Sequence, residues 1–173
     1  MKKIFTLVFV AALFASCSDD PATTPTPAPT PTVITGNFLG VWNFDGLIQT
    51  NGSITWDGDE VSSYSSVSSN EVGTVEYKSD GTVISNIGYD YVTTLSLGGD
   101  QEFSIPQSVY QGTYTHDANA NTLTSVSQGQ SSISNIIELT ANSMVLQLEV
   151  ATEQVSSGIV VRSSNTTTIT YSK

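Results

Sequence analysis

Three carboxylates follow Trp56 within four residues, in the sequence Asp57-Gly58-Asp59-Glu60. Ca²⁺ takes about six to eight oxygen ligands, so clustered carboxylates are the first place to look for a cation site. The spacing here matches no complete calcium-loop motif. The cluster therefore predicts a solvated turn and no metal site.

A second group of oxygen-bearing side chains, Asp117, Asn119 and Asn121, copies the first half of a calcium loop. Such a loop needs a glycine directly after these residues and a glutamate at its end. The chain has Thr122 and Gln128 at those places, which favours a hairpin turn without a metal ion.

His116 is the only imidazole that could act as a base. It is expected at a strand end beside a turn, and the many serines give no diagnostic partner for a Ser/His/Asp arrangement. Glycoside hydrolysis needs only two carboxylates at a set separation. The carboxylates available for it are Asp57, Asp59, Glu60, Asp100 and Glu102, and nothing in the sequence positions them. We therefore expect no enzyme, no catalytic residue and no cofactor.

Aromatic faces can bind sugars or lipids, although aromatic side chains also fill β-sheet cores. Trp56 is expected in a polar loop, and we take it as a candidate ligand contact, with a core or anchoring role as the alternative.

Composition limits the partners of this chain of 173 residues. Its five basic and sixteen acidic side chains give a net charge of −11, and only 12% of the residues are charged. This balance argues against nucleic acid and against charge-driven binding to anionic lipid. One cysteine makes no internal disulfide, and the length suits one domain.

The N-terminal sequence predicts a secretory signal peptide. A basic start, Met1-Lys2-Lys3, precedes an apolar run over residues 4–14, which is too short to span a bilayer as a helix. The following Ala15-Ser16-Cys17 resembles the lipobox of bacterial lipoproteins, which implies a signal peptide of residues 1–16 and acylation of Cys17. Fatty acyl chains on Cys17 would anchor the protein to the cell envelope.

Two features after Cys17 bear on location. Retention in the inner membrane usually goes with an aspartate directly after the cysteine, and this chain has Ser18 there. The acidic pair Asp19-Asp20 resembles an export signal of surface-exposed lipoproteins, and a solvated linker charge is the alternative. We expect an outer-membrane location. Residues 17–35 then form the lipidated start and a linker, whose Pro/Thr-rich part is expected to act as an extended spacer.

Residues 36–173 show hydrophobic residues at a period of two, as in strands with one buried face. Ile133 to Leu139 and Met144 to Val150 are such runs, and Val155, Ile159 and Val161 form a third. Turn residues such as Ser79-Asp80-Gly81 separate the runs. The pattern predicts an all-β, antiparallel up-and-down barrel of eight to ten strands, with a β-sandwich as the alternative.

Three short motifs occur in order along this region: Gly40-Val41-Trp42, Asp80-Gly81-Thr82 and Gly112-Thr113-Tyr114. The ordered set resembles the bacterial lipocalin-like lipoprotein domain. The resemblance implies an eight-stranded barrel whose closed end is plugged by Trp42, a structural residue. It also implies an arginine from the last strand region over that tryptophan, for which Arg162, the chain's only arginine, is the candidate, with a solvent-facing arginine as the alternative. Residues 52–70 are rich in serine, glycine and acidic residues and are expected to form a long loop, which this fold would place at the open mouth.

Together these features predict a lipid-anchored, monomeric and non-enzymatic barrel that binds a small hydrophobic or amphipathic molecule. The alternatives are a surface module for glycan or protein and a structural envelope component without a ligand.

Overall fold

The computed structural model describes residues 33–156 and 158–173. The predicted signal peptide, Cys17 and the Pro/Thr-rich stretch lie outside the described residues.

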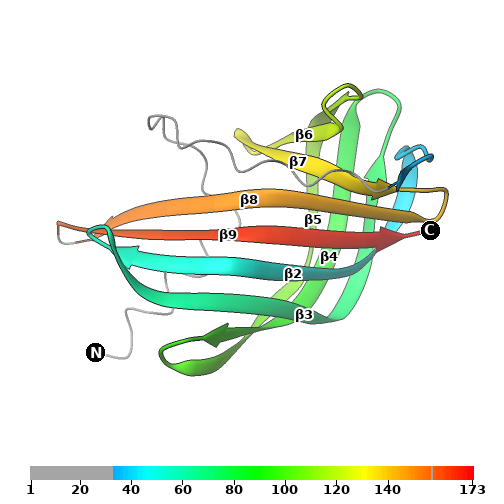
Figure 1. Cartoon of the computed structure of the whole chain (residues 1–173). Coiled ribbons are helices and arrows are strands. Elements are labelled where there is room, and N and C mark those ends of the chain that lie inside the picture. The colour runs from blue at the N-terminus through cyan, green and yellow to red at the C-terminus, as the bar shows by residue number, and fades with distance from the viewer. Residues whose placement is uncertain (1–32, 157) are drawn as a thin grey trace.

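Nine strands make up the described chain and belong to one sheet (Figure 1). They are β1 (Val33–Ile34), β2 (Gly40–Trp56), β3 (Asp59–Tyr77), β4 (Thr82–Leu95), β5 (Gly99–Asp117), β6 (Thr122–Ser127), β7 (Gln130–Leu139), β8 (Ser143–Ser156) and β9 (Ile159–Ser172). From β2 to β9 each strand pairs antiparallel with the next, and β9 returns to pair with β2. These eight strands form a closed antiparallel up-and-down barrel. The predicted fold class is confirmed, and the sandwich alternative is wrong.

No helix long and apolar enough to cross a membrane is found in the part of the chain that the structure describes.

Alternation of side chains along each strand fills the barrel. On β8, Met144 and Leu146 are buried, whereas Glu149 and Glu153 are exposed. Successive side chains of a strand point to opposite faces of the sheet, so the period of two places the apolar set inside. The predicted hairpin at Ser79-Asp80-Gly81 is confirmed, because β3 ends at Tyr77 and β4 begins at Thr82.

The predicted long loop over residues 52–70 is wrong. These residues belong to β2 and β3, which are joined by a tight turn at Asp57 and Gly58, both with positive φ (50° and 97°). Two such residues in succession suit the twist of a hairpin. The many serines of β3 resemble a loop composition, so this strand was not predicted, although its inward positions include the buried Tyr64 and Ser66.

The third predicted apolar run is also wrong as a single strand. Val155 lies near the end of β8, whereas Ile159 and Val161 belong to β9. The run therefore crosses a hairpin turn. At the other end of the barrel, β1 pairs parallel with β7, so Val33 and Ile34, which precede the predicted domain start at residue 36, belong to the sheet.

The barrel is closed unevenly along its axis. β6 and β7 have 6 and 10 residues, whereas their neighbours β5 and β8 have 19 and 14. β5 pairs with β6 only from Thr113 onward, and β8 pairs with β7 only up to Gln147. Among described residues, the edges formed by residues 99–112 of β5 and 148–156 of β8 thus have no strand partner. We call the interval between these two edges the seam.

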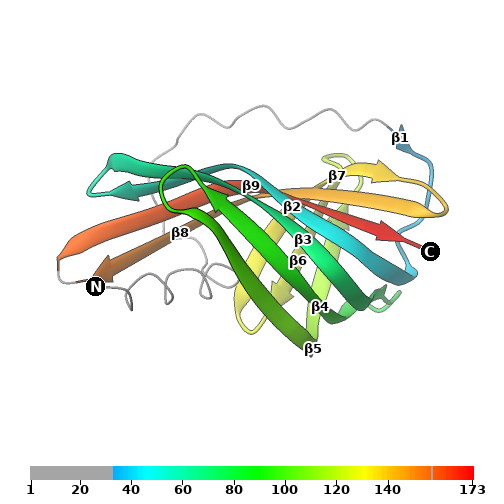
Figure 2. The same cartoon turned by 90° about the horizontal axis from the view of Figure 1, so that it is seen from below.

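The two ends of the barrel therefore differ. We call the end around Trp42 the closed end, where eight strands meet. The opposite, open end carries the tips of the β2–β3, β4–β5 and β8–β9 hairpins, which lie on one side of the molecule in Figure 2. Only six strands reach it.

Candidate functional site

Trp42 is the centre of the closed end. Its side chain is 0% exposed, and its indole Nε1 donates a hydrogen bond to the Phe38 carbonyl at 2.6 Å. The ammonium of Lys173 lies 4.1 Å from the indole ring centroid and donates to the Leu39 carbonyl at 3.1 Å. A cation over an indole face is attracted by the ring quadrupole, so Lys173 fastens the last strand over the plug.

The prediction that Arg162 packs over Trp42 is wrong. Arg162 pairs with Thr55 near the open end, and its Nε lies 2.8 Å from a carboxylate oxygen of Glu153. Lys173 takes the expected role because Ser172 pairs with Asn43, which places the next residue at the tryptophan. Counting the register back from the end of β9 could have found it.

Aromatic side chains extend the plug into the barrel. Phe38, Tyr77 and Tyr114 make mutual edge-to-face contacts with ring centroids 5.2–5.9 Å apart. Burial raises the pKa of the Tyr77 hydroxyl above its ordinary value, and burial likewise raises the pKa of Tyr171. Both phenols are neutral at physiological pH, as ordinary tyrosines are, and burial keeps them neutral to higher pH.

The buried aromatic side chains at the closed end form the floor of the barrel interior. Above this floor, buried polar side chains cross the interior. Ser66 and Thr93 share a hydrogen bond of 2.9 Å, and both are at most 1% exposed. Asn165 donates to the Tyr64 hydroxyl at 2.9 Å and accepts from Thr167 at 2.6 Å. We call these five residues the polar belt. The sequence analysis missed it, although serine and threonine at inward positions of predicted strands were the available signal.

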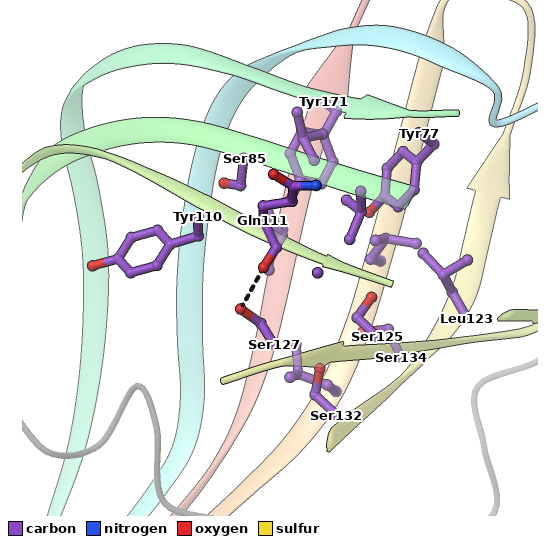
Figure 3. A pocket seen from close by; sticks show the side chains of 16 residues that line it. Tyr77, Ser85, Tyr110, Gln111, Leu123, Ser125, Ser127, Ser132, Ser134 and Tyr171 are labelled. Atoms are coloured by element: carbon purple, nitrogen blue, oxygen red, sulfur yellow. Dashed lines mark hydrogen bonds between the residues drawn. The ribbon is translucent and has the colours of Figure 1, made fainter. Parts of the chain in front are cut away.

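A cavity of about 210 Å³ lies between the floor, the β6–β7 hairpin and β8–β9. Its apolar lining comes from both sides of the barrel, with Leu123 from β6, Leu146 and Leu148 from β8, and Ile169 from β9. Tyr77 and Tyr171 form part of its floor (Figure 3). The remaining lining residues are Val75, Val83, Ser85, Tyr110, Gln111, Gly112, Ser125, Ser127, Ser132 and Ser134.

Five serines therefore give the cavity a polar wall. Ser127 donates its hydroxyl to the Gln111 carbonyl at 3.3 Å, the contact drawn in Figure 3. The hydroxyls of the other four serines make no hydrogen bond to another described residue, so they can bond a guest. These four are Ser85, Ser125, Ser132 and Ser134.

The chemistry of this lining is suited to a small molecule. All sixteen lining residues are uncharged at neutral pH. An apolar surface with a few polar groups is typical of small-molecule pockets, in which the polar groups orient the ligand. A guest would place its apolar part against the leucines and its polar part against the serines.

The residues predicted for other chemistry lie away from the cavity lining. Trp56 is 44% exposed at the end of β2. Asp57 accepts a hydrogen bond from the Val160 amide at 2.9 Å, which links the β2–β3 turn to β9. Glu60 accepts one from Ser53 at 3.1 Å, which links β2 to β3. Asp59, Asp100 and Glu102 are exposed near the same open end.

At the closed end, His116 contacts the Phe38 ring at 4.7 Å between centroids. The predicted turn at Asp117 is confirmed, because its Oδ1 accepts from the Asn119 amide at 2.8 Å. The Ala120 and Asn119 amides lower the pKa of the Asp117 carboxyl. Within the described residues, no three potential metal ligands lie together.

Comparisons with protein-family models, with curated proteins and with solved structures found no match for this chain.

Proposed function

We propose that this protein is a carrier or receptor for a small, uncharged amphipathic molecule, which it holds in the cavity under the seam. The observation that carries this proposal is the lining, which combines leucine side chains and serine hydroxyls without a single charged group. An apolar cavity of about 150 Å³ holds a benzene-sized guest. A cavity of about 210 Å³ suits a guest somewhat larger than benzene.

Binding without catalysis fits this lining better than hydrolysis. A general acid or base works best with a pKa near the operating pH. The ionisable groups of the lining are tyrosines, and burial raises the pKa values of Tyr77 and Tyr171. The closed barrel and its buried Trp42 support a lipocalin-like domain as the binding unit.

The proposal includes a lipid anchor on Cys17 and a location in the outer membrane. Its support is the apolar run over residues 4–14, the lipobox-like Ala15-Ser16-Cys17 and the serine that follows. A Cys17→Ser variant is expected in the soluble fraction of the cell envelope. Membrane retention of that variant would contradict the anchor and would leave the cavity proposal standing.

Octanol and octanoate test the cavity, because they share a tail and differ in charge. The full chain in detergent is titrated with each while the methyl signals of Leu123 and Leu146 are followed by NMR. Octanol is expected to shift both signals, and octanoate at least tenfold less at equal concentration. Equal shifts with both probes, or no shift with octanol, would overturn the proposal.

Two phenylalanine substitutions on β7 control for the location. Ser132 lines the cavity, whereas Ser131 pairs with the exposed Val126 on the outer face. Ser132→Phe is expected to abolish the octanol response, and Ser131→Phe is expected to leave it intact.

A surface module acting through Trp56 is the second candidate, and the exposed indole at the open end favours it. Trp56→Ala is expected to leave octanol binding unchanged if the cavity is the site.

A further inference from the structure

The seam exposes a regular backbone edge on β8. β8 keeps an unbroken register with β9 from Ser143 to Ser156. The Lys173 amide donates to the Asn142 carbonyl, and the Thr140 amide donates to the Ser143 carbonyl. Even-numbered residues therefore bond β9, and odd-numbered residues face the side of β7, because these directions alternate along a strand.

Beyond Gln147 the odd-numbered backbone groups have no strand opposite them among the described residues. The N–H and C=O groups of Glu149, Ala151, Glu153 and Val155 point into the seam. This row of donors and acceptors has the spacing of a strand, and it is the pattern that an added strand recognises.

The edge of β5 across the seam is less suited to pairing. Pro106 lacks an N–H, and the register between β4 and β5 is interrupted near it, between Ile87/Ser108 and Tyr89/Ile105. Proline and irregularities are the usual means by which natural proteins block an edge. The β8 edge has neither over residues 148–156.

Side chains on both edges of the seam follow one pattern. Leu148 and Val150 of β8, and Ile105 of β5, lie on the inner face and are half-buried. The exposed outer positions include Glu149 and Glu153 of β8, and Asp100 and Glu102 of β5. On β8 the inner side is therefore apolar at Leu148 and Val150 and polar beyond them, at Thr152 and Gln154, whereas the outer side carries two acidic residues on each edge.

We propose that the β8 edge is a docking site for an extended peptide with apolar residues on one face and basic residues on the other. Paired strands present opposite residues on the same face of the sheet. The peptide's basic residues lie opposite Glu149 and Glu153, and its apolar residues cover Leu148 and Val150. A second copy of this chain is disfavoured, because its net charge of −11 repels the same edge. The docking site borders the cavity at Leu148, which lines both, but it rests on the unpaired β8 edge and not on the small-molecule function.

The test uses a synthetic peptide of alternating lysine and valine, about as long as residues 148–156, with blocked ends. Binding to the full chain in detergent is followed by fluorescence anisotropy, and amide hydrogen exchange reports the location. The peptide is expected to slow exchange at Glu149, Ala151, Glu153 and Val155. A scrambled peptide of the same composition is expected to bind at least tenfold more weakly.

Two matched controls separate backbone pairing from charge attraction. We place the peptide antiparallel to β8, as β7 is, so that the lysine amides opposite Glu149 and Glu153 bond β8, whereas the valine amides point away from it. N-methylation of the lysines is expected to weaken binding at least tenfold, and N-methylation of the valines to weaken it less. Ala151→Pro removes the backbone N–H of residue 151 from the seam. Like N-methylation of the lysines, it is expected to weaken peptide binding at least tenfold. Ala141→Pro, in the β7–β8 turn, is the protein control and is expected to bind like the unmodified chain.

Equal binding of the scrambled peptide, or protection elsewhere than on β8, would overturn the proposal. The proposal would also be wrong if the four amides were already protected in the free chain and lost that protection on deletion of residues 21–32. The edge would then be occupied by the chain's own Pro/Thr-rich segment.

Discussion

The two tryptophans of β2 mark the contrast between the ends of the barrel. Trp42 at the closed end is 0% exposed, beneath a lysine, whereas Trp56 at the open end is 44% exposed. At the closed end, eight strands surround an aromatic plug. At the open end, six strands remain, and two edges have no strand partner among the described residues. One strand thus contributes both to the buried plug of the closed end and to the accessible open end.

Truncation of the two tryptophans should show the largest difference in stability between the two ends. Trp42→Ala removes a fully buried indole and is expected to lower the free energy of unfolding by about 4 kcal/mol. Trp56→Ala is expected to cost less than about 1 kcal/mol, because its indole is largely accessible already. Urea unfolding of the full chain measures both, and equal losses would contradict the contrast.

Alkaline pH should weaken the barrel through its buried phenols. Burial, with a further contribution from Tyr91, raises the pKa of Tyr89 from 10.0 to about 12. An unfolded tyrosine ionises near pH 10 while the folded one stays neutral, so stability is lost as pH rises from about 10 to 12. The loss is expected to reach about 3 kcal/mol for this residue.

Tyr89→Phe is the control for the pH effect. The variant cannot ionise at this position, so its unfolding free energy is expected to fall less steeply above pH 10 than that of the unmodified chain. Parallel pH profiles would show that Tyr89 does not contribute.

The polar belt should be sensitive to losing one partner and tolerant of losing two. Thr93→Val leaves the buried Ser66 hydroxyl unpaired, with an expected cost of about 2 kcal/mol. Adding Ser66→Ala to that variant is expected to cost less than the two single effects combined, because no orphaned hydroxyl remains. A strictly additive double-mutant cycle would show that the two hydroxyls do not interact.

The smallest expected difference separates the two basic residues of the C-terminal strand region. Lys173→Met removes a cation from the Trp42 face and is expected to cost about 1 kcal/mol. Arg162→Met breaks an exposed ion pair with Glu153 and is expected to cost below about 0.5 kcal/mol. The reverse order in thermal or urea unfolding would restore Arg162 as the stabilising residue.

Fold class was accessible from the sequence because the period of two and the turn residues act locally. The hairpin at Asp80 follows from such a local signal, whereas the plug role of Trp42 was implied by the resemblance to lipocalin-like domains. The turn at Asp57-Gly58 was predicted, but its flanking strands were taken for a loop because their many serines resemble one, and only burial in the closed barrel shows that they are strands.

The candidate site was less accessible, because it depends on register between distant strands. Leu123 and Ile169 line one cavity although they lie on β6 and β9. The choice between Arg162 and Lys173 likewise depends on which residue of β9 meets Asn43. The seam depends on the relative lengths of four strands, and boundaries are what sequence patterns define least well.

Residue-resolved hydrogen exchange of the full chain, free of added peptide, tests most directly whether the barrel is closed at one end and open along the seam at the other. The account predicts slow exchange throughout Met144 to Gln147, where β8 has partners on both sides. Beyond that point it predicts alternation, with slow amides at Leu148 and Val150 and fast amides at Glu149 and Ala151. Uniform protection along the whole of β8 would contradict the open seam, and uniform fast exchange would contradict the barrel itself.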